Sequence, residues 1–195
     1  MIPAIWIIVA VSLSALFITL GTGANAAFKT PNNSSTIAVK FAFFMAVSYF
    51  SFYYIGTWIT GYLLNMMPKE MWRMTSAILL FAVAVKTVWN VFSYKSEDNV
   101  YNLSKTIIQL MLSVAGGFNA LLLSMGLTLF QVGTGFTFTR NLILRTALIV
   151  ILGAFIGTVS GAGLSINSAK TVTKLRPAIV GGMIMLALAV YLFVR

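Results

Sequence analysis

Two polar residues occupy matching places in otherwise apolar stretches of this chain. Ser14 opens the string Ser14-Ala15-Leu16, and Asn119 opens the string Asn119-Ala120-Leu121, 105 residues further on. In both strings four residues follow the Leu before a Gly, which is Gly21 in the first and Gly126 in the second. A hydroxyl and a carboxamide provide neutral oxygen atoms and hydrogen bonds. The pair therefore predicts a site for a weakly hydrated monovalent cation or a polar neutral solute.

A simpler interpretation exists for each polar residue in these stretches. An amide in the middle of an apolar helix needs a partner, and an interhelical hydrogen bond from Asn119 would meet that need without any function. The hydroxyl of Ser14 can bond back to its own helix. Lys86 lies about two turns inside another apolar stretch, where an ammonium either extends to the membrane boundary or acts as a fixed positive charge. Such a charge replaces a bound cation or attracts an anion.

All three acidic residues, Glu70, Glu97 and Asp98, fall between the apolar stretches, and the chain has no Cys and no His. A hard divalent cation needs carboxylate charge to give up its water, and a proton relay needs Asp, Glu or His within the membrane. We therefore expect no catalytic residue, no cofactor and no enzyme activity, and the sequence leaves open whether a metal binds. The Lys and Arg residues are scattered, which excludes a nucleic-acid-binding stripe.

The elements that position these residues are apolar stretches long enough to cross a bilayer. The 195 residues are 59% hydrophobic and 8% charged, with a mean hydropathy of +0.96. Six stretches, each near the ~20 residues that a membrane helix requires, cover residues 2–20, 37–64, 72–92, 106–130, 142–159 and 178–194. The sequence therefore predicts an all-α integral membrane protein with six transmembrane helices. We expect them to form a single domain, residues 1–195, in the lipid bilayer of the inner membrane.

Basic residues are more numerous on one side of these predicted spans. The side with the odd-numbered connectors holds eight Lys and Arg residues, and the other side holds five. Without Lys86 and Arg145, which lie inside apolar stretches, seven remain against four. Because positive charge stays on the cytoplasmic side of a membrane protein, we expect both termini outside the cytoplasm.

The Ser14 and Asn119 strings belong to a longer internal repeat. Ile55-Gly56-Thr57 with Gly61 recurs as Ile156-Gly157-Thr158 with Gly161, and Ala84-Val85 recurs as Ala189-Val190. The three echoes link the first, second and third stretches to the fourth, fifth and sixth in order. Chance recurrence in apolar sequence is the alternative, but the shared order favours two halves, about 1–95 and about 105–195. Each half has an odd number of spans, so the second half is inverted, as in many transporters.

The stretch 118–132, FNALLLSMGLTLFQV, resembles the fourth helix of the bacterial manganese efflux pump family, and the stretch 12–24 is similar to its first helix. Length, six spans, orientation and the repeat also match. The resemblance implies a central ion site, for which the family carries acids at the positions of Ser14, Ser48, Asn90 and Asn119 and a basic residue at Lys86. Since none of these acids is present here, we expect a manganese site of the family type to be dismantled.

Two functions remain open on this basis. The first is a protein of transporter fold that moves a cation or small polar solute through a site lined by Ser14, Ser48, Asn90 and Asn119, with Lys86 nearby. The second is a transport-inactive relative that serves as a structural subunit or scaffold of a membrane complex. The expected partners are the bilayer, the solute, and either a second copy in a homodimer or partner membrane subunits.

Overall fold

The structure is a computed structural model that describes residues 4–29, 35–93, 103, 105–133, 140–164, 168, 171–172 and 176–194. The six long helices in this part of the chain are α1 (Ala4–Lys29), α2 (Ser35–Met66), α3 (Lys69–Ser93), α4 (Thr106–Gly133), α5 (Arg140–Ala162) and α7 (Pro177–Val194). Throughout the residues described, regular structure is helical, as the continuous apolar stretches predict. The all-α fold is therefore confirmed.

Three of the helices are long and apolar enough to cross a membrane. These segments are Thr36–Met66, Lys69–Trp89 and Thr106–Phe130. Shorter apolar segments in the described parts of α1, α5 and α7 are Val9–Ala24, Thr146–Ala162 and Pro177–Tyr191. A helix bonds its backbone groups internally, so it can lie in hydrocarbon without unsatisfied donors or acceptors. Length and composition thus support a membrane-embedded protein.

The outer surface of α2 supports the same conclusion. Phe43, Phe50, Tyr54 and Trp58 are more than half exposed along this helix, which has 32 residues. Contiguous exposed apolar surface of this extent is unusual on a protein surrounded by water. Lipid chains are the surroundings that suit it.

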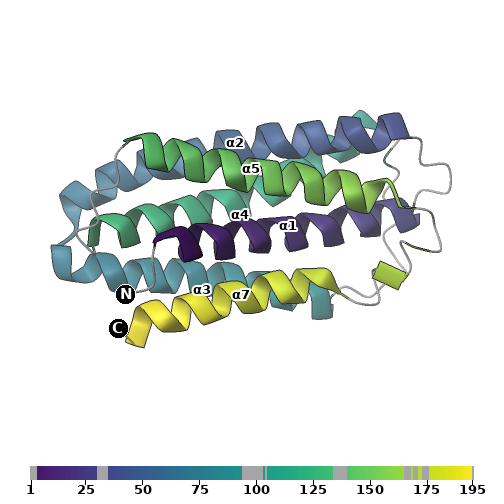
Figure 1. Ribbon diagram of the computed structural model, residues 1–195. Coiled ribbons are helices and arrows are strands. Elements are labelled where there is room, and N and C mark those ends of the chain that lie inside the picture. Colours follow the sequence, from purple (N-terminus) through teal and green to yellow (C-terminus); the bar gives the residue numbers. More distant parts are fainter. Residues whose placement is uncertain are drawn as a thin grey trace.

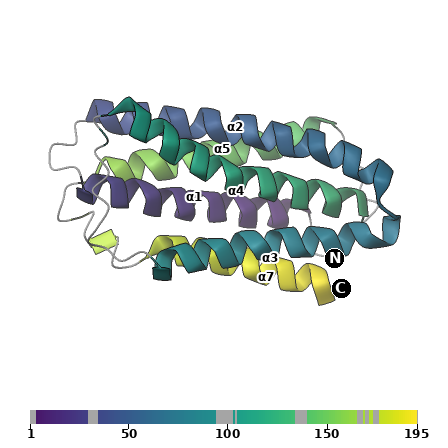
Figure 2. The same cartoon turned by 180° about the vertical axis from the view of Figure 1, so that it is seen from behind.

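The helices form a closed ring that is flattened into two layers. Figure 1 shows α5, α1 and α7 in the near layer, and Figure 2, seen from behind, shows α2, α4 and α3 in front. Within the layers α1 packs on α5 and α7, and α4 packs on α2 and α3. Contacts of α2 with α5 and of α3 with α7 close the ring. The two central helices, α1 and α4, therefore lie opposite each other, and α1 begins at the end of the bundle where α7 finishes.

The first helix is longer than its apolar stretch. Hydropathy predicts an end near residue 20, whereas α1 continues to Lys29 through Gly21 and Gly23. Both glycines lie against other helices: a Cβ on Gly21 would be 3.3 Å from Ala178 Cβ, and one on Gly23 would be 2.7 Å from Thr158 O. Close backbone approach of this kind stabilises helix pairs in membranes. Tertiary packing, rather than local hydropathy, keeps this segment helical.

The interior of the ring is filled by one cluster of buried side chains from all six helices. Its largest members include Phe41, Met45, Leu80, Leu127 and Met185, each 2% exposed or less. Leu103, which precedes α4, belongs to the same cluster and is fully buried. Polar side chains that occur within this interior are surrounded by hydrocarbon, so their hydrogen bonding becomes informative.

Candidate functional site

Ser14 lies near the middle of α1, and its hydroxyl has no hydrogen-bond partner although the residue is fully buried. Other hydroxyls on this helix bond back to it. Thr19 Oγ1 donates to Ala15 O at 2.8 Å, and Thr22 Oγ1 donates to Ile18 O at 3.0 Å. The backbone bond that a simpler interpretation expects of Ser14 is therefore not formed. Its hydroxyl has no hydrogen-bond partner among the described residues.

Asn119 lies in the middle of α4, and its Oδ1 is also buried without a partner. The predicted alternative, an interhelical hydrogen bond that satisfies this oxygen, is not formed. An unsatisfied buried polar group costs about 1–3 kcal/mol. Among the described residues one other buried side-chain atom lacks a partner, Gln109 Oε1. Two of these three unpaired atoms thus belong to the pair that the internal repeat singles out.

Contacts through α7 place Ser14 and Lys86 at a similar height in the bundle. A Cβ on Gly181 would be 2.8 Å from the backbone oxygen of Ser14. The next residue, Gly182, faces α3, where a Cβ would be 2.8 Å from Val88 Cγ2. Neighbouring residues of a helix differ by about 1.5 Å in height. Lys86, two residues before Val88 on α3, therefore lies close to the height of Ser14.

Contacts between α3 and α4 bring Asn119 to the same height. A Cβ on Gly126 would be 3.0 Å from Leu80 Cγ and 3.4 Å from Ser76 O. The two helices are antiparallel (Figure 2). Seven residues back along α4 lead from Gly126 to Asn119, and seven residues forward along α3 lead to residues 83–87, about 10 Å in each case. Lys86 lies in that turn.

Ser48 reaches this height from α2, but its hydroxyl is already bonded. A Cβ on Gly117, two residues before Asn119, would be 2.5 Å from Ser48 Oγ. The same Oγ donates to Ser113 O of α4 at 2.7 Å. This bond stabilises the packing of α2 on α4. The structure thus brings Ser14, Ser48, Lys86 and Asn119 to one height on four helices, without a hydrogen bond from one of these four to another.

Lys86 and Asn90 are the two residues of the predicted site that lie on α3. Lys86 is half-buried, and its ammonium makes no hydrogen bond or ion pair with the described residues. Both interpretations of this lysine, an extended anchor and a fixed positive charge, are compatible with that position. Asn90 continues α3 one turn beyond Lys86, and its side chain lies outside the described residues.

Apart from the Lys86 ammonium, the polar side chains at this height are neutral hydroxyl and amide groups. Across the described ranges no group of three or more His, Cys, Asp or Glu side chains could hold a metal ion. Glu70, the acid that these ranges include, is exposed at the start of α3. A hydroxyl and an amide oxygen without carboxylate charge suit polar solutes and weakly hydrated ions far better than hard divalent cations.

Residues outside the predicted set also carry buried polar atoms. Gln109 is 1% exposed near the start of α4, and Ser76 Oγ donates to Gly126 O at 2.6 Å across the α3–α4 contact. The sequence could have pointed to Gln109, since an amide inside an apolar stretch is costly unless it has a hydrogen-bonding role. It gives no such indication for Ser76, because serine is ordinary at helix contacts.

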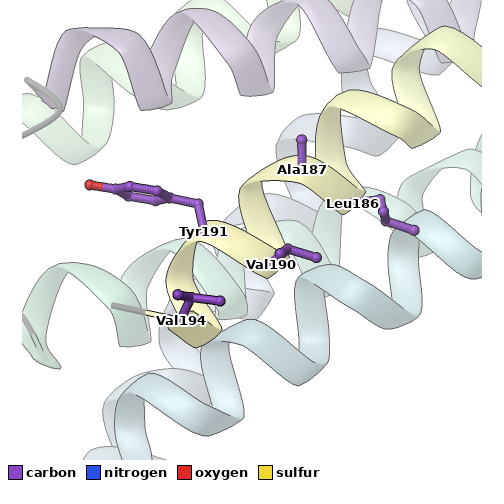
Figure 3. A pocket seen from close by; sticks show the side chains of 5 residues that line it. All are labelled: Leu186, Ala187, Val190, Tyr191 and Val194. Carbon is purple, nitrogen blue, oxygen red and sulfur yellow. The ribbon is translucent and has the colours of Figure 1, made fainter.

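A hollow on α7 contains none of the candidate site residues. It is lined by Leu186, Ala187, Val190, Tyr191 and Val194, all near the end of that helix. Figure 3 shows aliphatic side chains together with the Tyr191 ring, whose hydroxyl points away from Leu186. The lining is apolar and wide open, which fits a surface covered by lipid chains.

No protein-family model, curated protein or solved structure matches this chain. The class of protein defined by the structure is a helical, membrane-embedded one. The similarity of two of its helices to the manganese efflux pump family stays a prediction.

Proposed function

We propose that the chain is a six-span membrane transporter that moves a cation or a small polar solute through a site between Ser14 and Asn119. One observation carries the proposal: Ser14 Oγ and Asn119 Oδ1, which the internal repeat relates, are both buried and unpaired. Unsatisfied buried groups are rare in native proteins and call for an explanation. A solute that hydrogen-bonds to these two atoms, or is coordinated by them, supplies one.

The pairing of the helices supports two inverted halves. If α1, α2 and α3 exchange places with α4, α5 and α7, the main contacts stay the same: α1 on α5 becomes α4 on α2, and α1 on α7 becomes α4 on α3. Single residues follow the same rule. Gly56 of α2 lies against Leu121 of α4, and Gly157 of α5 lies against Leu16 of α1. Inverted halves around a site at mid-membrane are a recurrent transporter architecture.

The proposal includes six crossings of the inner membrane with both termini outside the cytoplasm. Its support is the charge at the end of the bundle where α2, α4 and α7 begin, which includes Lys40, Lys105 and Arg176. Because the chain has no Cys, single cysteines at Lys69 and Lys105 report sidedness directly. In intact cells an impermeant thiol reagent should label the Lys69→Cys variant and spare the Lys105→Cys variant. The reverse pattern would refute the orientation.

Transport by purified protein in liposomes tests the site. Uptake of rubidium and of neutral polar solutes should fall at least about tenfold when Ser14→Ala and Asn119→Ala are combined, because both ligands are lost. Ser124→Ala is the matched control, since that buried hydroxyl donates to Leu121 O at 2.8 Å within its own helix. Equal uptake by the control and the double variant would remove Ser14 and Asn119 from the site.

Binding to a carboxylate-restored site is the complementary experiment. Calorimetry should detect manganese binding by the combined Ser14→Asp and Asn119→Asp variant if the two positions face one solute. The unaltered protein, which offers neutral oxygen atoms, should bind manganese far more weakly. If calorimetry detects no manganese binding by either protein, the two positions do not share a ligand.

A second candidate function is a structural subunit without transport. The observation that favours it is the lack of acidic side chains within the described helices beyond Glu70 at the start of α3, because ion transporters commonly use acids there. Isolation from native membranes in mild detergent discriminates between the two. A stoichiometric partner subunit supports the scaffold, whereas a lone monomer or homodimer supports the transporter.

A further inference from the structure

A line of polar groups, exposed at one end of the bundle and buried further in, leads from that end to the height of Ser14 and Asn119. It follows the contact between α2 and α4 and consists of Lys40, Ser48, Thr106, Gln109 and Ser113, named here the polar seam. Ser48 Oγ donates to Ser113 O, and Ser113 Oγ donates to Gln109 O, both at 2.7 Å. At the end of the bundle Lys40 Nζ donates to Thr106 Oγ1 at 3.0 Å. From Thr106 to Ser113 the seam covers about 10 Å of α4.

Gln109 is the one member of the polar seam with an unsatisfied atom. Its Nε2 donates to Leu103 O at 2.6 Å, and its Oε1 is buried without a partner. The amide cannot be turned over, because a carbonyl at 2.6 Å requires a donor and the amide oxygen is not one. Gln109 therefore presents a hydrogen-bond acceptor to the interior, ten residues and about 15 Å before Asn119 along the same helix.

The unsatisfied atoms share one chemical requirement. Gln109 Oε1, Asn119 Oδ1 and Ser14 Oγ are all oxygens that accept hydrogen bonds, and no buried side-chain nitrogen of the described residues is left without a partner. A ligand that follows this route is therefore either a cation that these oxygens coordinate or an uncharged solute that donates hydrogen bonds to them.

The positive charge at the end of the seam favours one of these two ligand classes, the uncharged solutes. Lys40 and Lys105 are both exposed there. With Lys86 left aside, the connectors and helix ends on this side of the chain carry seven Lys and Arg residues against two acids, Glu97 and Asp98. A surplus of one sign repels ions of that sign from an entrance lined by low-dielectric walls. Cations are therefore disfavoured where the seam begins.

We infer that the polar seam is the route by which an uncharged, hydrogen-bond-donating solute reaches the central site, and that Gln109 Oε1 is its first binding group. The inference rests on the proposed transport function and selects the neutral solute among the two substrate classes. At this end of the seam Leu103 is fully buried, and its carbonyl oxygen accepts the hydrogen bond from the Gln109 amide.

Urea and guanidinium provide a matched pair of probes. Both are planar and of similar size, both donate several N–H hydrogen bonds, and they differ in charge. Protein-containing liposomes should shrink and recover in a urea gradient, with a recovery rate well above that of empty liposomes. They should respond to guanidinium as empty liposomes do. Faster passage of guanidinium than of urea would overturn the selection of a neutral solute.

Two substitutions test the role of Gln109 itself. Gln109→Met keeps an unbranched side chain but removes the acceptor, so urea permeation should fall about fivefold to tenfold, the worth of one buried hydrogen bond. Thr128→Val is the control: it removes a buried hydroxyl of α4 that lies outside the seam and donates to Ser124 O at 2.8 Å, and it should permeate urea within about twofold of the original rate. Equal rates in both variants would refute the assignment of Gln109.

A charged variant answers the same question if Gln109→Met does not fold. Gln109→Glu retains acceptor oxygens and adds negative charge, so the ratio of guanidinium to urea permeation should rise about tenfold, and an unchanged ratio would contradict the seam as the route. If the original protein conducts rubidium and not urea, this inference fails and the proposed transport function stands. If it conducts no solute at all, both fail.

Discussion

The contact between α1 and α5 provides the sharpest test of the packing described above. Gly157 lies in the middle of it, and a Cβ there would overlap the Leu16 carbonyl oxygen and Thr19 Oγ1 and would lie 3.1 Å from Leu20 N. Two of these three atoms belong to the backbone of α1, which cannot rotate away as a side chain can. Gly157→Ala therefore forces the two helices apart.

The magnitude follows from two opposing effects. Overpacking of a tight contact costs about 1–3 kcal/mol, and the backbone overlap at Gly157 places this substitution in the upper half of that range. Replacing Gly by Ala in a helix recovers at most about 1 kcal/mol through helix propensity. We expect Gly157→Ala to lower the free energy of unfolding by about 1–2 kcal/mol.

Gly61 is the matched control, because it belongs to the string that echoes the one around Gly157. It is exposed on α2, and a Cβ there would meet no atom within 4 Å. Gly61→Ala should therefore leave the free energy of unfolding unchanged or raise it by up to about 1 kcal/mol.

Reversible unfolding in mixed micelles, followed by tryptophan fluorescence, measures both variants against the original protein. The chain has four Trp residues as reporters. Equal stability of Gly157→Ala and Gly61→Ala, or a more stable Gly157→Ala, would refute the close approach of α1 to α5. Gly56→Ala should behave as Gly157→Ala does, since a Cβ there would be 2.6 Å from Leu121 O.

Three further substitutions separate polar groups that stabilise the fold from those that do not, all measured by the same unfolding assay. Ser76→Ala should lower the free energy of unfolding by about 0.6 kcal/mol, the usual worth of an interhelical hydrogen bond in membranes, because it removes the 2.6 Å bond to Gly126 O; a neutral result would contradict that bond. Ser14→Ala should be neutral or stabilising by up to about 1 kcal/mol, because an unpaired buried hydroxyl is removed, and a clear loss of stability would reveal a partner for Ser14. Lys86→Met should stabilise the fold by up to about 3 kcal/mol, and destabilisation would show that the ammonium is paired in the membrane.

Part of the candidate site is predictable from the sequence because it depends on spacing along single helices. The offset of 105 residues relates Ser14 to Asn119 without any knowledge of their surroundings. The rise of about 1.5 Å per helical residue then fixes how far along its own helix each of Lys86 and Ser48 lies. That these residues share one height depends in addition on how the helices slide past one another, and the contacts of Gly181, Gly182 and Gly126 settle that register.

The hydrogen bonding of each polar residue is not predictable in this way. Ser14 and Thr19 are both fully buried hydroxyl residues on one helix, yet Thr19 is bonded and Ser14 is not. Ser48 donates to α4, an outcome that its sequence neighbours do not indicate. Gln109 has its amide group held by Leu103, a contact across the start of α4. These outcomes depend on side-chain rotamers that only the packed neighbours select.

The sequence by itself determined that this protein is helical and suited to a membrane, because apolar length and the need to satisfy backbone groups in hydrocarbon are local properties of each stretch. The tertiary structure alone decided that α1 packs on α5 and α4 on α2, since partner choice depends on the shapes of all six helices together. Gly61 and Gly161, which occupy matching positions in the internal repeat, show the difference. Gly161 lies against the backbone of α1 at Leu20 and Gly23, whereas Gly61 faces open space, because a residue's surroundings are set by the neighbouring helix and not by its own string.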